Sequence, residues 1–566
     1  MTHARTPAAR PRFSEQFAPK LLTVLREGYG IAALRADALA GLTVAIVALP
    51  LSMAIAIASG VGPERGLYTA IIGGFLVSAL GGSRFQIGGP AGAFIILVAA
   101  CVQTLGVPGL LTATLISGLL LMAAGFLRLG QYVKFIPYPV TVGFTAGIAV
   151  IIFSSQIKDL FGLSLPGGEP SALAPRLAAL WDARGSVTWP AVGLAVLTIA
   201  VIQGIKSWRP QLPSLLIAVT LAALAAFFLH LPVETIGTKF GALPRTLLAP
   251  ALPDLSASSV MAALPFALSF TLLGSIESLL SAVVADGMSG RHHRSNAELV
   301  AQGVANIGSA LFGGVPVTGT IARTATNVRA GARGPVAGIF HALFVLLFLL
   351  VAAPLAGYIP LAALAGVLAV VAWNMAEKAE FWTLLRSSPG DALVLLSTFL
   401  LVIFRDLSEG IVVGFAIGSL LFIHRMSQTA ELREGLPLAV EDHADAGNGY
   451  EGRPDHDVLV YRIAGAFFFG AASAIGTTLD RLADRPRAFV LDLSEVPLLD
   501  SSAAHTIEML GRKMARRGGS LYLTGARREV RQALLSLGLR EPHAHYRATI
   551  EDALAEVRNE VRITPE

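Results

Sequence analysis

Cysteine and charged residues are both scarce in this chain. Of 566 residues, one is a cysteine and only 14% are charged, whereas 54% are hydrophobic. The single Cys101 excludes an intrachain disulfide and a zinc cluster built on thiolates. The mean hydropathy of +0.66 is well outside the range of soluble globular chains. The apolar excess is therefore expected to face lipid.

Charge is not scarce everywhere. From about residue 37 to residue 425 charges are sparse and clustered, whereas roughly the last 110 residues alternate apolar and charged residues as a water-soluble domain does. The pattern predicts an N-terminal arm over 1–36, a transmembrane transport domain over 37–427, a polar linker over 428–454 and a soluble domain over 455–566.

The basic N-terminal arm lacks an apolar run ending in a small-residue cleavage site, which favours a cytoplasmic arm over a signal peptide. The net charge of +5 arises from basic residues in loops between apolar runs, where orientation in the membrane explains them. No nucleic-acid partner is therefore expected. The absence of a Walker loop, a catalytic triad and a metal-ligand spacing predicts a non-enzyme without cofactor or metal.

Charge, proline and glycine clusters divide the apolar region into about fourteen segments, several too short to cross about 30 Å of hydrocarbon as one regular helix. They are expected to begin near residues 37, 66, 91, 108, 136, 189, 213, 261, 298, 318, 334, 358, 390 and 408. An even number places both termini on one side, and the short loops of that side carry Arg84, Arg128, Arg294 and Arg329. Because cytoplasmic loops are enriched in Lys and Arg, both termini are predicted to be cytoplasmic.

Two glycine-proline breaks recur at matching places in the two halves. Gly88-Gly89-Pro90 introduces the third segment and Gly313-Gly314-Val315-Pro316 the tenth. This spacing predicts two repeats of seven segments, which are inverted because seven is odd. Half-helices that begin at such breaks can direct their positive N-termini at one anion, so the site is predicted between the third and tenth segments.

The eighth segment contains one ionisable side chain, Glu277. A charge at bilayer depth costs about 2.5 to 3.5 kcal/mol on insertion scales. Glu277 is therefore expected to have either a functional role or an interacting partner. It is predicted to exchange protons near neutral pH; the alternative is a structural hydrogen bond or ion pair. Ser281 lies one helical turn after Glu277 on the same helix face. It either shares a polar site with Glu277 or contributes to packing between helices.

The tenth segment opens with Thr318, Gly319 and Thr320, where free backbone N–H groups beside hydroxyls suit an oxyanion. Arg323 lies about one turn deeper. It either adds positive potential to the site or neutralises Glu277.

A resemblance to a known family is carried by the run Pro63–Thr69 and by Gly82-Ser83-Arg84 leading to Gly88-Gly89-Pro90. These resemble the signature of the sulfate permease family, SulP or SLC26, as do the position of Glu277 and the run 327–333. The likeness spans nearly the whole chain. It implies an α-helical polytopic membrane protein with fourteen segments in a seven-plus-seven inverted repeat, in which a core domain moves against a gate domain, and it implies a homodimer.

The same resemblance implies site residues. On this chain the family's anion site corresponds to Pro90, Ala91, Phe94, Thr318, Gly319, Thr320 and Arg323. Members often carry Gln after a Leu-Pro pair in the first helix, but here Leu51 follows Leu49-Pro50, so one polar contact is absent. A glutamate at the position of Glu277 resembles proton-coupled bacterial members, which implies proton coupling, with Ser281 beside it, in a bacterial inner membrane.

The soluble domain is predicted to be a small α/β unit, with strands over 458–462, 488–492 and 520–524 and helices over 501–516 and 527–537. The run 492–496 and the following Asp500-Ser501-Ser502 resemble the STAS domain, which implies a regulatory or dimerising module. Ser501 and Ser502 are predicted to cap the helix; phosphorylation is the alternative, as in soluble relatives.

Three functions follow from these observations. The first is proton-coupled symport of sulfate or a dicarboxylate across the lipid bilayer. The second keeps the fold but transports bicarbonate with sodium or exchanges anions. The third is a membrane-anchored regulatory protein.

Overall fold

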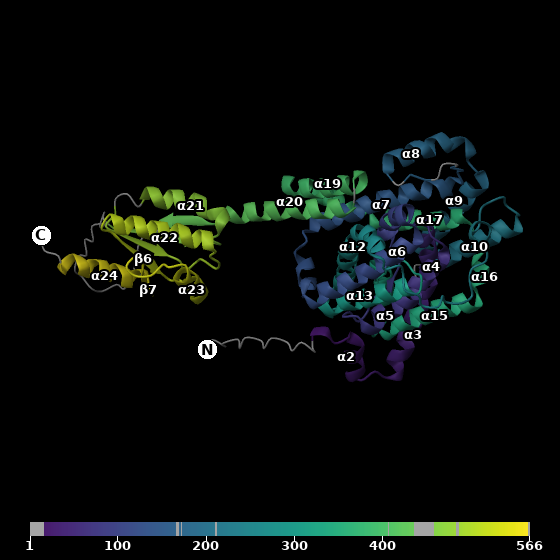
Figure 1. Ribbon diagram of the computed structural model, residues 1–566, viewed down its shortest axis with the longest axis horizontal. Coiled ribbons are helices and arrows are strands. Elements are labelled where there is room, and N and C mark those ends of the chain that lie inside the picture. Colours follow the sequence, from purple (N-terminus) through teal and green to yellow (C-terminus); the bar gives the residue numbers. More distant parts are fainter. Residues whose placement is uncertain are drawn as a thin grey trace. The chain divides into compact units, whose positions relative to one another are not determined.

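The computed structural model describes residues 16–165, 169–170, 172–209, 212–405, 407–434, 458–482 and 486–563. The chain divides into two compact units, Met1–Phe415 and Ala416–Glu566. The first unit is a bundle of helices and the second contains a sheet (Figure 1). The boundary falls inside helix α20 (Leu407–Ser427).

The first half of the helical unit runs from the N-terminal arm to the long loop before residue 257. Its elements are α2 (Lys20–Arg26), α3 (Ile31–Ala58), α4 (Pro63–Tyr68), the π-helical turn η1 (Thr69–Gly73), α5 (Gly74–Leu80), β1 (Gly88–Gly89), the 3-10 turn η2 (Gly92–Phe94), α6 (Ile95–Phe126), η3 (Leu129–Phe135), α7 (Tyr138–Phe161), α8 (Leu173–Asp182), η4 (Ala183–Ser186), α9 (Trp189–Trp208), α10 (Ser214–Phe228) and α11 (Ile236–Phe240).

The second half repeats the pattern of long helices around a short strand. Its elements are α12 (Ala257–Ser289), α13 (Ser295–Leu311), β2 (Thr318–Gly319), α14 (Ile321–Arg329), α15 (Val336–Val351), α16 (Ala353–Ala356), α17 (Leu361–Met375), α18 (Lys378–Ser387), α19 (Pro389–Phe404) and α20.

Helical segments begin close to each of the fourteen predicted starts. Among the described residues, seven helices are long and apolar enough to cross a membrane by length and composition. The other segments are shorter or interrupted. Gly106 lies inside α6 with φ 69° and ψ −177°, which is not a helical conformation, so it separates the third segment from the fourth. Glycine adopts this backbone conformation readily, whereas it is strained for other residues.

Helix contacts divide the unit into two bodies. The core body is formed by α3, α5 and α6 from the first half with α12, α13, α14 and α15 from the second. The gate body is formed by α7, α9 and α10 with α17 and α19. Each body takes corresponding helices from both halves, which is the arrangement expected for inverted repeats.

Small residues hold the core body together. A methyl group added to Gly118 of α6 would lie 2.7 Å from the carbonyl oxygen of Gly303 on α13. Only glycine permits this approach, and close backbone packing replaces the hydrophobic effect as the attraction between helices in lipid.

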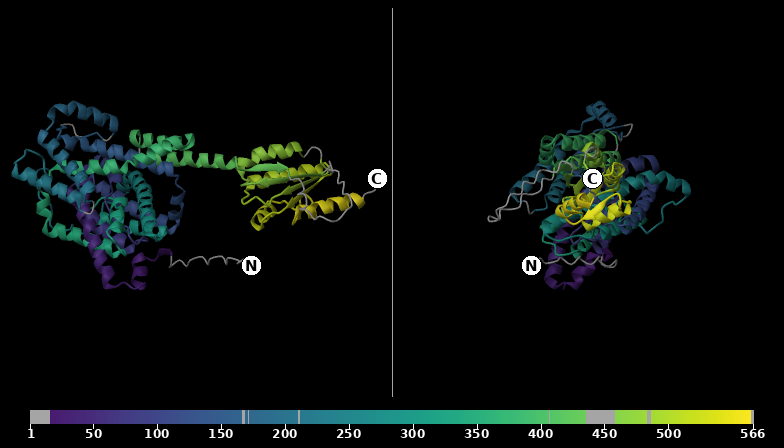
Figure 2. Two further views of the ribbon diagram at one scale, coloured as in Figure 1. Left: turned by 180° about the vertical axis from the view of Figure 1, so that it is seen from behind. Right: turned by 90° about the vertical axis from the view of Figure 1, so that its left-hand side faces the viewer.

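The C-terminal unit contains a five-stranded sheet in the order β3-β4-β5-β6-β7. β3 pairs antiparallel with β4, and the other pairs are parallel. Helices cover both faces of the sheet (Figure 2). The strands are β3 (Glu431–Glu434), β4 (Val458–Ala464), β5 (Ala488–Asp492), β6 (Ser520–Thr524) and β7 (His545–Arg547), and the helices are α21 (Phe469–Leu482), α22 (Ser501–Arg516), α23 (Arg528–Ser536) and α24 (Ile550–Ile563).

Alternation of apolar side chains along the strands builds two cores. Phe489, Leu491 and Leu523 face α21, α22 and α23, whereas Val490 and Tyr522 face α24. The observed β3 falls inside the stretch predicted as a linker over 428–454, and it extends the sheet by backbone pairing with β4. Residues 435–454 of that stretch lie outside the described residues.

Candidate anion site at the paired chain breaks

The two predicted breaks meet inside the core body. β1 and β2 form an antiparallel pair in which Gly88 faces Gly319 and Gly89 faces Thr318. Beyond the pair, the N–H of Thr320 donates to the carbonyl oxygen of Ile87 over 3.1 Å. The third and tenth segments therefore start side by side.

Neither helix start is capped by a side chain. The N-cap residues are Ala91 before η2, Phe94 before α6 and Thr320 before α14, and none of them accepts a capping hydrogen bond. The Thr320 hydroxyl has no hydrogen-bond partner among the described residues. Uncapped N–H groups at two converging helix starts are a favourable environment for an anion.

Arg323, on the first turns of α14, is 1% exposed. Its Nη2 donates to Ser52 Oγ of α3 over 3.2 Å and to the carbonyl oxygen of Pro90 over 3.1 Å. Its Nε and Nη1 have no acceptor within the described part of the chain. The guanidinium thus retains donor capacity for a ligand.

Glycine at position 89 makes room for this guanidinium. A methyl group at Gly89 would collide with Arg323 Nη1, and one at Gly319 would collide with the amide of Gln86. Gln86 in turn donates from Nε2 to Ser278 Oγ over 2.8 Å. The glycines of both strands are therefore required by the side chains that pack on them.

Glu277 lies on α12 and is 7% exposed. It forms no hydrogen bond or ion pair with any residue the structure describes. In particular, no salt bridge joins Glu277 to Arg323 in the described part of the chain. One turn earlier on α12, the carbonyl oxygen of Gly274 accepts from Thr318 Oγ1 over 3.2 Å, so Glu277 follows directly on the contact between α12 and β2.

Ser281 occupies a different place from Glu277. It is fully buried, and its hydroxyl donates to Thr324 Oγ1 over 3.1 Å. Thr324 Oγ1 also accepts from the N–H of Ile87 over 3.1 Å. Ser281 therefore connects α12 to α14 and, through Thr324, to the segment that precedes β1. This contact fits the alternative in which Ser281 contributes to packing between helices.

Phe94 is also buried, at 2% exposure, and its ring lies 5.9 Å from that of Phe270 on α12. Leu51, where family members often carry Gln, is 7% exposed. Sequence reasoning missed Ser52, the next residue, although it supplies the polar contact from α3 to Arg323. It also missed Gln86, whose only sequence signal is its place just before the Gly-Gly-Pro break.

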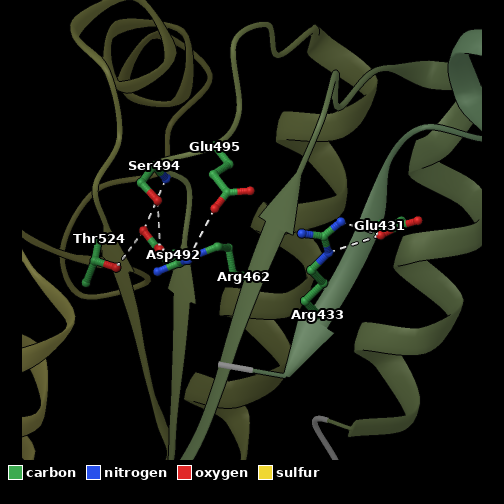
Figure 3. Close-up of polar contacts among 7 residues, drawn as sticks. All are labelled: Glu431, Arg433, Arg462, Asp492, Ser494, Glu495 and Thr524. Atoms are coloured by element: carbon green, nitrogen blue, oxygen red, sulfur yellow. Dashed lines mark hydrogen bonds and ion pairs between the residues drawn. The ribbon is translucent and has the colours of Figure 1, made fainter. Parts of the chain in front are cut away.

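In the C-terminal unit, Asp492 is the centre of a polar cluster at the end of β5 (Figure 3). Its carboxylate accepts from Arg462 Nε over 2.6 Å and from Ser494 Oγ over 2.8 Å. Arg462 Nη1 also pairs with Glu495 over 3.2 Å, and its hydrogen bond to Asp492 raises the pKa of the guanidinium. These contacts provide partners for the side chains of Asp492, Ser494 and Glu495, which belong to the run that resembles the STAS domain.

The predicted cap of α22 was wrong. Asp500 is the N-cap, and its carboxylate accepts from the N–H of Ala503 and from the N–H of Phe469, both over 2.9 Å. Ser501 and Ser502 are the first helical residues and are exposed. Asp500 prevails because its two carboxylate oxygens serve α22 and α21 at once, which one hydroxyl cannot do.

Comparison with known proteins follows the same division. The chain matches the model of the sulfate permease family over residues 34–398 and the STAS domain model over residues 451–553. The chain belongs to the sulfate permease family. The first match lies within the helical unit and the second lies within the C-terminal unit. The family match agrees with the multi-pass helical fold.

Relatives of the chain are named as transporters of two different anions. The chain is 38% identical over 517 residues to the putative sulfate transporter YvdB of Bacillus subtilis, a match that covers 91% of this chain and 95% of that protein. It is 31% identical over 529 residues to the bicarbonate transporter BicA of Synechocystis, covering 89% and 90% respectively.

A solved structure shows the same fold. The murine Solute Carrier 26 family member A9 anion transporter superposes with a TM-score of 0.83 at 18% identity, covering 99% of this chain and 96% of that one. Such a likeness supports the fourteen-segment inverted-repeat fold with an appended STAS domain.

Proposed function

We propose that the chain is a secondary active transporter that couples uptake of an oxyanion, sulfate or a dicarboxylate such as succinate, to protons by alternating access. The observation that carries the proposal is the buried Arg323, which has unused donors beside two uncapped helix starts. A buried cation without a counter-charge is costly unless a ligand supplies one. An anion satisfies both the arginine and the helix N-termini.

Glu277 supports the proton part of the proposal. A carboxylate in the membrane interior is rare, and partnerless it is costly to keep charged. Thr318, which the proposal places at the anion, is bonded to the same helix one turn away. A protonated Glu277 removes negative charge from the region of the anion, so anion and proton binding are expected to favour each other.

Sodium-coupled bicarbonate symport or anion exchange is the second candidate. It is favoured by the bicarbonate transporter among the relatives and by Leu51, which removes a polar contact from the site. A smaller singly charged anion needs fewer donors than sulfate. The membrane-anchored regulatory protein is the third candidate and predicts no uptake at all.

The remaining assignments belong to the same proposal. The transporter lies in a bacterial inner membrane with both termini in the cytoplasm, forms a homodimer and uses its STAS domain for regulation or dimerisation. Ser501 and Ser502 are exposed at the start of α22, where a phosphate group is favoured by the helix N-terminus. Phosphorylation there is a candidate regulatory step.

Uptake into proteoliposomes tests the proposal. Labelled sulfate, succinate and bicarbonate are supplied under an inward proton gradient, an inward sodium gradient, or neither, with chloride or bicarbonate inside as a separate arm. We expect sulfate or succinate uptake to rise with the proton gradient. Stimulation by sodium or by trans anions instead supports the second candidate, and no uptake of any anion supports the third.

A further inference from the structure

Two polar cavities lie on the face of the helical unit opposite to the start of α3. One, of about 280 Å³, is lined by the end of α3, the first turns of α6, the end of α7, α8 and α11. The other, of about 430 Å³, is lined by the end of α7 and by residues of α9, α11 and α17. Lys158, Asp159 and Lys239 line both cavities, which therefore meet at these three side chains. We name the joined space the far vestibule.

The far vestibule lies beside the helix that starts at the candidate site. Ile95, Ile96, Ala99 and Gln103 of α6 line its smaller cavity, and Ile95 directly follows Phe94. The cavity therefore runs along the first turns of the helix whose start forms one side of the candidate site. The core body supplies this wall and the gate body supplies Lys158 and Asp159 of α7, so the vestibule lies between the two bodies.

Charges in the vestibule are unequally satisfied. Arg176 of α8 is 5% exposed, pairs with Glu169 over 3.0 Å and donates to the carbonyl oxygen of Pro170 over 2.9 Å. Lys239 Nζ lies 3.8 Å from Glu234 Oε2. The side chains of Lys158 and Asp159 form no hydrogen bond or ion pair with any described residue, although the charges of Lys158 and Lys239 both act on Asp159.

We infer that the far vestibule is an anion-binding site in which Lys158 and Lys239 attract the incoming anion and the negative charge of Asp159, when ionised, opposes that attraction. Protonation of Asp159 removes a negative charge that lies beside both ammonium groups, so acid on this side favours anion binding before any transport step. This inference rests on the proposed function for the direction of transport only. It names a subsite and a pH response separate from Glu277.

The other titratable groups of the vestibule leave this balance in place. They are Glu169, Arg176 and Glu234, each of which has an ion-pair partner; α3, α6, α9 and α17 contribute only side chains that do not titrate. Burial raises the pKa of Glu169, opposed by Arg176, so acid also reduces negative charge there. Both carboxyl groups therefore shift the vestibule toward positive charge as pH falls.

Transport kinetics give the first test. Initial rates of labelled sulfate uptake are measured while inner and outer pH are lowered together, so that the proton gradient stays constant. Lys158→Gln and Lys239→Gln are each expected to raise KM about threefold to tenfold with little change in the maximal rate. Asp159→Asn is expected to lower KM at neutral pH and to flatten its dependence on pH.

Arg405→Gln is the matched control, because Arg405 is a cation in a short loop, exposed and outside the vestibule lining. Its KM is expected to match that of the unaltered protein. Equal KM changes in this control, or a loss of maximal rate without a KM change in the lysine variants, would overturn the inference.

A second measurement does not depend on transport. In a Cys101→Ser background, Gln103→Cys places a thiol on the vestibule wall, and its reaction rates with an anionic and a cationic methanethiosulfonate reagent are compared. The anionic-to-cationic ratio is expected to rise as pH falls and to lose that rise in Asp159→Asn. A ratio unaffected by pH or by either lysine refutes the vestibule site. A ratio that behaves as expected in a protein without uptake refutes the proposed function alone.

Discussion

Buried charges are treated in opposite ways in the two units. In the C-terminal unit, Asp492 is 3% exposed and its carboxylate is fully engaged by neighbouring donors. In the core body, Arg323 keeps two unused nitrogens and Glu277 has no partner among the described residues. A buried charge with hydrogen-bond and ion-pair partners helps to hold a fold in one arrangement. An unpaired charge in the membrane interior carries a desolvation cost, which a bound ligand or a proton removes.

The largest effect is expected for Arg323→Ala. Truncating one member of a buried charge pair costs about 2–5 kcal/mol, so the KM for the transported anion is expected to rise by at least about thirtyfold. Thermal stability of the purified protein is expected to stay the same or to increase, because an unpaired buried charge is removed. A large loss of stability with unchanged KM contradicts a ligand role, and Arg405→Ala provides the control.

Asp492→Ala is the converse experiment. Removing this carboxylate takes away the acceptor of Ser494 Oγ and Thr524 Oγ1 and one of the two acceptors of Arg462, and the C-terminal unit is expected to lose about 3 kcal/mol of stability. Faster amide hydrogen exchange in β4, β5 and β6 of the full chain measures the loss. Glu495→Ala removes a carboxylate whose side chain is 47% exposed and is expected to cost much less. Equal exchange in both variants contradicts the central role of Asp492.

Glu277→Gln tests the role of the unpaired carboxyl group in the helical unit. The amide cannot exchange protons, so anion uptake is expected to continue down its own gradient while stimulation by an inward proton gradient disappears. Asp254→Asn, at an exposed acid in the loop before α12, is the control and keeps the stimulation. An unchanged response to the proton gradient in Glu277→Gln excludes this residue as the coupling site.

The smallest effect is expected at a partly buried pair of the C-terminal unit, Arg547 and Glu556. The hydrogen bond from Arg547 lowers the pKa of Glu556, so the pair stabilises the fold above about pH 4.5 and loses its contribution as pH falls through the lowered pKa. Glu556→Gln is expected to reduce stability by about 0.5 kcal/mol at pH 7. The difference between the melting temperatures of the two proteins should narrow below pH 4.5; a constant difference refutes the ion-pair explanation.

Sequence patterns located the helical segments and the two breaks because composition and glycine-proline clusters are local signals. The repeat argument predicted that the third and tenth segments flank one site, but not that their starts pair as the strands β1 and β2. The partners of Arg323 did not, because Ser52 lies 271 positions away and nothing local specifies which hydroxyl faces a guanidinium. Gln86 escaped notice for the same reason.

The C-terminal unit shows a second limit. The strands 488–492 and 520–524 were predicted at their observed bounds, since each is a short apolar run between turns. At the start of α22, however, Asp500, Ser501 and Ser502 can each cap a helix. Asp500 is the cap because the N–H of Phe469 donates to its second carboxylate oxygen. Phe469 is distant from Asp500 in the sequence, so a local pattern does not reveal this contact.

The two-residue pairing of β1 with β2 has a consequence for selectivity. Because backbone hydrogen bonds join the two helix starts, the spacing between them is fixed by the peptide chain and not by the position of the gate body. In the proposed transport cycle, an anion that arrives from either side of the membrane meets the same distances and the same donors. Discrimination between anions is then a property of equilibrium binding that both directions of transport share, and the gate body determines only the solution to which the site is open.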